Sequence, residues 1–240
     1  MGSFVNNLKS FTLHPHNVDV PQDSPYKTKV TDTLKGAALY MGLAILACIP
    51  VFTLMKLVQY FYGIDLLKLR AANMKMAFNG PKKILIIALI APLMEETMCR
   101  LWLSFKRAHV VISVLLVAIV IAIKVNGGNI YSTSFHQFHV LYLLEGMALA
   151  GILLTLINKT AVKEFAQKHF NAVYYGSCIG FGLLHIMNFA PFKWSIIWAY
   201  PLLTLPQIIL GFILGHIRIK NGFVWGVALH CIINLGLSLV

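Results

Sequence analysis

Two glutamates and an arginine lie inside a single apolar stretch of the chain, ALIAPLMEETMCRLWLSF. They are Glu95, Glu96 and Arg100. A charged side chain in the middle of a membrane helix costs about 2.5–3.5 kcal/mol on insertion scales, so three together require a compensating role. In a helix, Glu96 and Arg100 are four residues apart and can form an ion pair on one face. Glu95 projects ~140° away from Arg100 at ~100° per residue, which leaves it available for another partner.

Two later apolar segments each contain a histidine with an asparagine about one helical turn further on. GFGLLHIMNF contains Phe181, His185 and Asn188, and ALHCIINLG contains His230 and Asn234. A single histidine in a membrane helix is usually a packed or hydrogen-bonded residue. Two such pairs, together with the glutamates of a third segment, favour a polar site inside the membrane.

Pro92 precedes Glu95 by three residues and lacks an amide donor, so it is expected to kink the helix and free the carbonyl of Ala88. Such a kink would help to open a wet cavity. Counted from the side of the N-terminus, Glu95, His185 and His230 lie ~15, ~20 and ~12 Å deep at ~1.5 Å per residue. We therefore expect the three groups to meet near mid-membrane. The alternative is a buried Glu–Arg pair that only fixes helix packing, with Glu95 protonated.

The composition excludes a water-soluble globule. Apolar residues make up 58% of the 240 residues and charged residues 12%, against about 45–50% and ~25% in soluble domains. The mean hydropathy is +0.76. The net charge of +12 comes from 20 Lys and Arg against 8 Asp and Glu. These cations lie between apolar segments, where membrane topology and anionic lipid headgroups explain them without a nucleic-acid partner.

The apolar runs have roughly the ~20 residues that a membrane-spanning helix requires. They predict an all-α fold, a polytopic transmembrane bundle of about seven helices. The predicted spans are 37–60, 84–105, 108–124, 138–158, 172–190, 195–217 and 222–240.

The chain divides into a polar N-terminal tail, 1–35, and an integral membrane domain, 36–240. The tail contains scattered charges and prolines, and we expect it to be mostly irregular. The mixed apolar and basic segment 64–78 predicts a helix at the membrane interface. Slightly more Lys and Arg fall on the side of the N-terminus, which favours a cytoplasmic N-terminus. His216, next to Arg218 at a predicted helix end, is interpreted as a headgroup contact.

Three short motifs fall in separate predicted helices: EExxxR (Glu95, Glu96, Arg100), FxxxH (Phe181, His185) and HxxxN (His230, Asn234). In this order they resemble the signature of the CPBP family, which includes CAAX prenyl endopeptidases and bacteriocin-processing or self-immunity proteins. The resemblance covers residues 84–238. Two departures bear on the subfamily and the substrate: Leu101 stands where many members have glycine, and 90 residues separate Glu95 from His185.

The resemblance implies an intramembrane endopeptidase of the glutamate type. By that analogy Glu95 and His185 activate a water molecule, and His230 and Asn234 stabilise the oxyanion. The remaining motif residues and their neighbour would support the site: Glu96, Arg100, Phe181 and Asn188. The implied substrate is a peptide or a membrane-anchored protein, and the expected location is a bacterial plasma membrane.

Three alternatives remain at this point. Glu95, His185 and His230 form a His₂Glu set of the type found at some catalytic zinc sites. Because the chain has no HExxH motif, we favour a mechanism with no metal or other cofactor. The protein would otherwise be a non-enzymatic immunity or scaffold protein of the same fold. Intramembrane Glu and His also mark proton-coupled transporters, although no inverted repeat is evident in the sequence.

Overall fold

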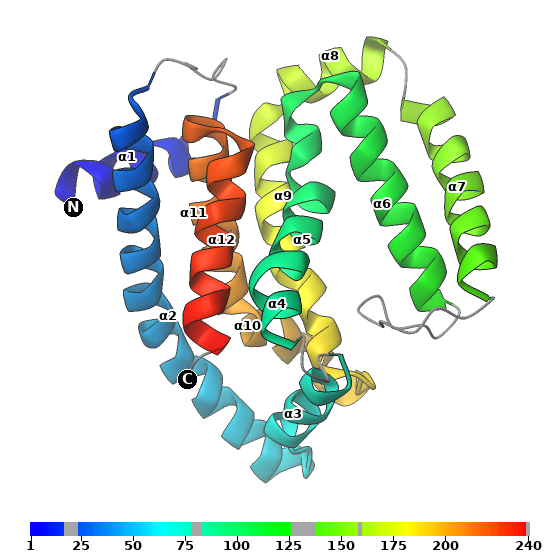
Figure 1. The fold of residues 1–240 in the computed structure, drawn as a ribbon. Helices are drawn as coiled ribbons and strands as arrows, with labels where there is room; N and C mark the ends of the chain where they lie inside the picture. Colours follow the sequence, from blue (N-terminus) through cyan, green and yellow to red (C-terminus); the bar gives the residue numbers. More distant parts are fainter. Residues whose placement is uncertain (17–23, 78–82, 126–137, 158–159, 239–240) are drawn as a thin grey trace.

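The computed structural model describes residues 1–16, 24–77, 83–125, 138–157 and 160–238, and every regular element in these ranges is helical (Figure 1). The elements before the first motif are α1 (Gly2–Leu13), α2 (Tyr26–Tyr62), α3 (Leu66–Ala77), α4 (Lys83–Leu85) and the π-helical turn η1 (Ile86–Ile90). The middle of the chain forms α5 (Ala91–Cys99), the 3₁₀ turn η2 (Leu101–Ser104), α6 (Arg107–Val125), α7 (Phe138–Ile157) and α8 (Thr160–Lys168). The last part forms α9 (Phe170–Leu184), the 3₁₀ turns η3 (His185–Phe189) and η4 (Trp194–Ala199), α10 (Tyr200–Leu203), α11 (Leu205–Asn221) and α12 (Phe223–Ser238).

Helices occupy all seven of the apolar segments named above, but several are interrupted. Two helices of the described chain are long and apolar enough to cross a membrane, within Tyr26–Tyr62 and Arg107–Lys124. A third candidate is the pair Trp194–Leu203 and Leu205–Asn221, bent by 40°, if it is counted as one span. The fold is therefore all-α, with two or three helices of spanning length.

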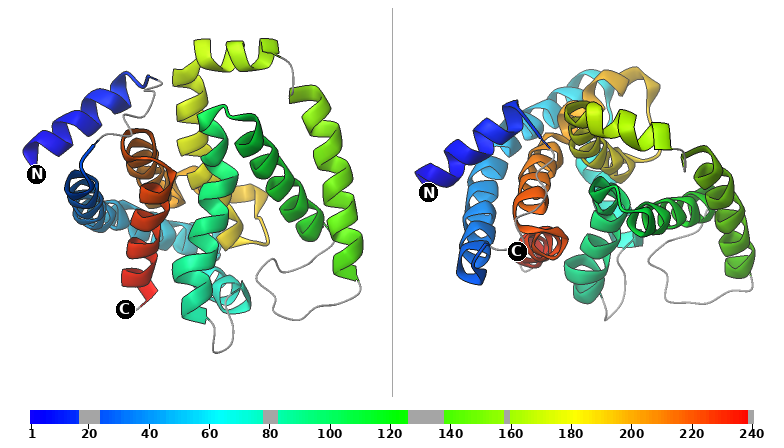
Figure 2. Two further views of the ribbon diagram at one scale, coloured as in Figure 1. Left: turned by 45° about the horizontal axis from the view of Figure 1, so that its top comes forward. Right: turned by 90° about the horizontal axis from the view of Figure 1, so that it is seen from above.

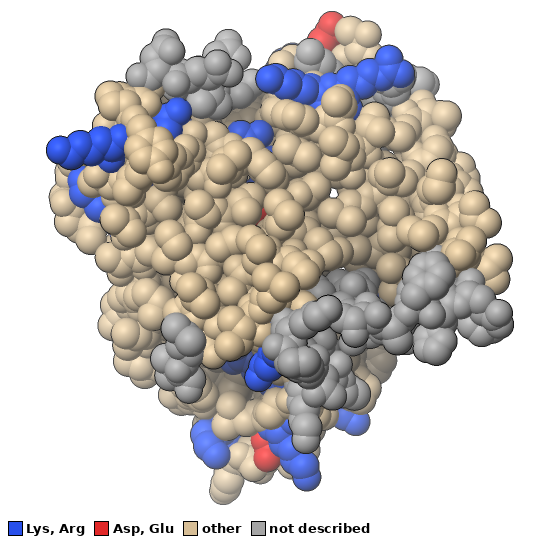
Figure 3. All heavy atoms as spheres, in the orientation of Figure 1, with Lys and Arg blue, Asp and Glu red and all other residues tan. Residues whose placement is uncertain are grey.

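The distribution of charge matches this reading. In Figure 3 the Lys and Arg side chains gather at two opposite ends of the visible face, and a broad uncharged band separates them. Large apolar side chains are also exposed, including Ile45, Leu46 and Ile49 of α2, which are about two-thirds exposed. An apolar belt between two basic rims is the surface that a lipid bilayer covers. These features indicate a membrane protein.

The expectation of an irregular tail was wrong. α1 covers Gly2–Leu13, and α2 already begins at Tyr26. Phe4 and Phe11 are seven residues apart, so they share a face of α1, and both are buried against α11. Pro15 lies beyond the end of α1, and Pro25 stands at the N-cap position of α2. The polar composition of the tail gave no indication of the short amphipathic helix α1.

Helix α11 lies at the centre of the fold and packs against α2, α9 and α12 (Figures 1 and 2). Its contact with α9 depends on small residues. A Cβ at Gly211 would lie 2.4 Å from the carbonyl oxygen of Cys178, and one at Gly182 would lie 2.3 Å from Ile208 Cγ1. The two backbones can approach this closely only because neither position carries a side chain.

Helices α6 and α7 form an antiparallel pair beside α5, with α7 at the outer edge in every view (Figure 2). Helix α3, within the predicted interfacial segment 64–78, lies at the end of the bundle where α2 and η3 terminate (Figure 1). It packs against η3. Helices α9 and α12 thus pack on α11, and α5 packs against both of them, while α3 lies at one end of that group.

Candidate active site

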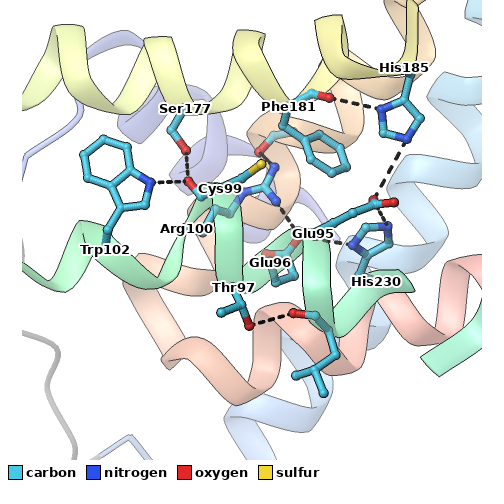
Figure 4. A network of polar contacts seen from close by, with 12 residues as sticks. Glu95, Glu96, Thr97, Cys99, Arg100, Trp102, Ser177, Phe181, His185 and His230 are labelled. Carbon is cyan, nitrogen blue, oxygen red and sulfur yellow. Dashed lines mark hydrogen bonds and ion pairs between the residues drawn. The ribbon is translucent and has the colours of Figure 1, made fainter. Parts of the chain in front are cut away.

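Glu96 and Arg100 form a closed ion pair in the centre of the bundle. The spacing in α5 puts both on one face, and both side chains are 0% exposed (Figure 4). The guanidinium also donates from Nη2 to the carbonyl of Gly211 at 3.3 Å, and its carbon lies 4.3 Å from the centre of the Phe181 ring. The pairing predicted from the four-residue spacing is confirmed.

Glu95 points to a different side of α5, toward two imidazoles. Its Oε2 lies 3.7 Å from Nε2 of His230 and 4.0 Å from Nε2 of His185. The side chains of Glu95 and His185 are 20% and 24% exposed, whereas that of His230 is 2% exposed. The structure therefore brings together the three groups that were expected to meet (Figure 4), and two of their side chains are partly exposed.

The local backbone determines which nitrogen of His185 faces Glu95. The predicted helix over 172–190 is not continuous, because α9 ends at Leu184 and a 3₁₀ turn begins at His185. The amide of His185 donates to Gly182, three residues back, so the carbonyl of Phe181 is free to accept from His185 Nδ1 at 3.0 Å. A carbonyl only accepts, so Nδ1 carries the hydrogen and the lone pair of a neutral imidazole is on Nε2.

His230 connects the closed pair to the open site. Its Nδ1 lies 3.1 Å from Oε1 of Glu96, the carboxylate paired with Arg100. That carboxylate accepts, so Nδ1 of His230 is the donor. It follows that His230 can donate from Nε2, the nitrogen nearest Glu95, only when both ring nitrogens carry a proton.

Phe181 is the apolar contact shared by these groups. It is 1% exposed, and its ring centre lies 5.1 Å from that of His185 and 5.6 Å from that of His230, both edge-on. The guanidinium of Arg100 packs on the same ring. One aromatic side chain thus packs against the cation and against both imidazoles.

Asn234 fills a hydrogen-bonding position that a proline leaves open. In the π turn the amide of Ala91 donates to Ile86, five residues back. The next amide in that register would be Pro92, which has no N–H. The carbonyl of Ile87 instead accepts from Asn234 Nδ2 at 3.1 Å. Because of the π register, Pro92 leaves the carbonyl of Ile87 without a helical donor, instead of the carbonyl of Ala88 as the sequence predicted.

The C-terminal end of α5 is fixed against α9. The carbonyl of Cys99 accepts from Ser177 Oγ at 2.7 Å and from Trp102 Nε1 at 2.9 Å (Figure 4). Carbonyls at a helix end lack helical partners, and here side chains supply them. The helix that carries both glutamates is therefore held at each end, by α12 at Ile87 and by α9 at Cys99.

Two residues that the sequence analysis did not select contact this group. Asn73 of α3 donates from Nδ2 to the main-chain carbonyls of Asn188 at 3.1 Å and Ala190 at 2.7 Å. The group of Asn188 that takes part in this contact is its main-chain carbonyl. No local pattern could have revealed this contact, because Asn73 is a polar residue on a surface helix 115 positions before Asn188.

Arg218 is the second missed residue, and the interpretation of His216 as a headgroup contact was wrong. His216 and Arg218 are 4% and 5% exposed, and His216 lies under the rings of Phe4 and Phe11 of α1. A Cβ at Gly226 would lie 3.5 Å from Arg218 Cβ and 3.6 Å from Glu96 Oε2. A second arginine thus approaches the closed carboxylate from α11.

The zinc alternative can be compared with the geometry. Among the described residues, no group of three or more His, Cys, Asp or Glu side chains is arranged to hold a metal ion. Oε2 of Glu95 lies 3.7 and 4.0 Å from the two imidazole nitrogens, whereas ligands at 2.0–2.1 Å from a tetrahedral zinc are about 3.4 Å apart. The arrangement of Glu95, His185 and His230 therefore does not fit a zinc ion as it stands.

Comparison of the chain with protein-family models, with curated proteins and with solved structures gives no match.

Proposed function

We propose that this protein is an intramembrane endopeptidase of the glutamate type. It would hydrolyse a peptide bond in a peptide or membrane-anchored protein. The observation that carries the proposal is the position of Glu95 Oε2, which lies between Nε2 of His185 and Nε2 of His230 with no hydrogen-bond partner, on a side chain that is 20% exposed. A carboxylate and a neutral imidazole that both present lone pairs to one point are suited to accept the two hydrogens of a water molecule.

In the proposed reaction, the water oxygen attacks the substrate carbonyl and forms the new C–O bond. Glu95 takes one proton from the water, and His185 Nε2 accepts a hydrogen bond from the other. The C–N bond then breaks, and Glu95 passes its proton to the leaving nitrogen. The products are a carboxylic acid and an amine, with no oxidant or reductant involved.

The oxyanion needs hydrogen-bond donors. His230 can supply one from Nε2 when both of its ring nitrogens carry a proton, since Nδ1 already donates to Glu96. The resemblance assigns the second donor to Asn234, whose amide has one hydrogen left after the bond to Ile87. Removing one preorganised donor of this kind typically costs about 2.7–4 kcal/mol of transition-state stabilisation.

The motif resemblance to the CPBP family supports the same proposal. From the apolar segments and the Lys and Arg bias, we further propose a bundle of about seven membrane helices with the N-terminus in the cytoplasm, in a bacterial plasma membrane. The uncharged band and basic ends of the visible face support the membrane location. A substrate segment would then approach Glu95 from the membrane or its surface.

The test is mass spectrometry of membrane peptides from cells that produce the wild-type protein or one of three variants. Glu95→Gln and His185→Ala are expected to abolish the cleavage products while expression and membrane insertion persist. Glu164→Gln makes the same chemical change at an exposed position of α8 and should retain them.

Full proteolysis by the Glu95 or His185 variant would contradict the proposal. If binding of a partner or self-protection survived in Glu95→Gln, the non-enzymatic alternative would replace it. A chelator is expected to leave cleavage unchanged, and loss of cleavage with the chelator would indicate the zinc-dependent variant.

A further inference from the structure

A surface helix is tied directly to the turn that begins with His185. Asn73 of α3 donates to the carbonyl oxygens of Asn188 at 3.1 Å and Ala190 at 2.7 Å. Both acceptors are carbonyls, so only the NH₂ group of the amide can face them. Its two hydrogens are sufficient for the two bonds. One side chain thus holds the end of η3 at two points.

Helix α3 is itself anchored, so this contact connects the turn to a fixed element. Leu66 is 1% exposed and packs in a buried cluster with Val58 of α2 and Phe189 of η3. The carboxylate of Asp65 accepts from the amide of Lys68 at 2.9 Å and caps the first turn of α3. The side chain of Phe189 and the backbone on either side of it are therefore both held by neighbouring elements.

The turn needs such support for physical reasons. A 3₁₀ turn has poorer hydrogen-bond geometry than an α-helix and is used in short pieces. The last carbonyls of any helix lack helical partners. At the other end of this five-residue turn, the bond from His185 Nδ1 to Phe181 directs Nε2 toward Glu95. Movement of η3 would shift that nitrogen.

We propose that Asn73 is a positioning residue for His185, and that α3 is thereby part of the active centre; this rests on the proposed hydrolytic function. Asn73 acts on the orientation of the base, without touching the substrate. Since a displacement of about 1 Å can lower a catalysed rate by roughly 10²-fold, loss of the two bonds should reduce kcat about 10- to 100-fold. KM should stay within about threefold of wild type.

The experiment compares Asn73→Ala, Asn73→Asp and Lys68→Ala in purified protein reconstituted in liposomes. Asn73→Asp keeps the size of the side chain but has no donor, so it should be at least as impaired as Asn73→Ala. A role in packing alone would leave Asn73→Asp close to wild type, which would overturn the proposal. Lys68 is exposed on the same helix, and its variant is expected to match wild type.

Amide hydrogen exchange over residues 185–190 gives a readout that is independent of cleavage. Exchange should increase in both Asn73 variants and remain unchanged in Lys68→Ala. Unchanged exchange in the Asn73 variants, or faster exchange with wild-type kcat, would overturn the proposal. A wild-type protein that cleaves no membrane peptide would instead contradict the hydrolytic function. Hydrogen exchange would still test whether the two bonds from Asn73 hold the turn.

Discussion

Glu95 and Glu96 are neighbours in the chain, yet they lie in two different regions of the molecule. Glu96 is 0% exposed and is surrounded by Arg100, His230 and, beyond Gly226, Arg218. Glu95 is 20% exposed, and its Oε2 lies 3.7 Å or more from the imidazole nitrogens. One residue of helix rotation, ~100°, separates the two environments. Glu96, which is surrounded by cations, stabilises the fold, whereas Glu95 keeps a lone pair that can accept a proton.

The two regions are joined through His230, which contacts one carboxylate with each ring nitrogen. The closed region therefore fixes the geometry of the open one. This division predicts that substitutions in the two regions will separate stability from activity.

The largest effect is expected at Glu95. Glu95→Gln removes the proposed general base and should lower the cleavage rate by about 10²–10⁴-fold, with little change in unfolding free energy, because Glu95 has no ion pair as tight as that of Glu96. Initial rates and denaturant unfolding on the same preparation will measure both. Losses of cleavage rate and unfolding free energy in parallel would contradict the distinction between the two regions.

Glu96→Gln is expected to act mainly on stability. It leaves the guanidinium of Arg100 buried without its partner, which typically destabilises a fold by about 3–5 kcal/mol. The double variant Glu96→Gln/Arg100→Met should be less destabilised than Glu96→Gln alone, because it also removes the unpaired charge. An additive loss in the double variant would show that the pair is not the source of the effect.

A smaller effect is expected at Asn234. Asn234→Ala leaves the carbonyl of Ile87 without its donor beside Pro92, which should cost about 1–3 kcal/mol of unfolding free energy. If Asn234 also stabilises the oxyanion, kcat should fall further than the folded fraction explains. A reduction of kcat that only parallels the folded fraction would limit Asn234 to its contact with η1.

The smallest effect is expected at Phe181. Phe181→Leu keeps an apolar side chain but removes the ring on which Arg100 packs, a contact worth about 0.5–2 kcal/mol. Both regions share this ring, so stability and kcat should decline together. A change in only one of them would assign Phe181 to a single region.

The sequence predicted the parts of this arrangement that follow from regular helices. The apolar segments are helical, Glu96 pairs with Arg100 at four-residue spacing, and Glu95 lies with His185 and His230. Each of these expectations needs only the helical repeat and the depth of a residue in its segment.

The remaining features depend on departures from that repeat or on distant contacts. The π turn at Ile86–Ile90 and the 3₁₀ turn at His185–Phe189 change the hydrogen-bond register, which apolar periodicity does not record. Asn73 bonds to the end of the turn that begins with His185, and Arg218 lies near Glu96, each from a helix that carries none of the motifs. Their roles became visible only when α3 and α11 were placed in space.

The most direct test of the contrast between the two carboxylates is the reactivity of a thiol at position 95 in the membrane. A Glu95→Cys variant in liposomes would be treated with a small, water-soluble thiosulfonate, and modification at each cysteine would be measured by mass spectrometry. Cys178 is a free thiol with 0% exposure and is the internal control for a closed position. We predict that position 95 is modified while Cys178 is not. Equal protection of both thiols until the protein is denatured would contradict a water-accessible site at Glu95.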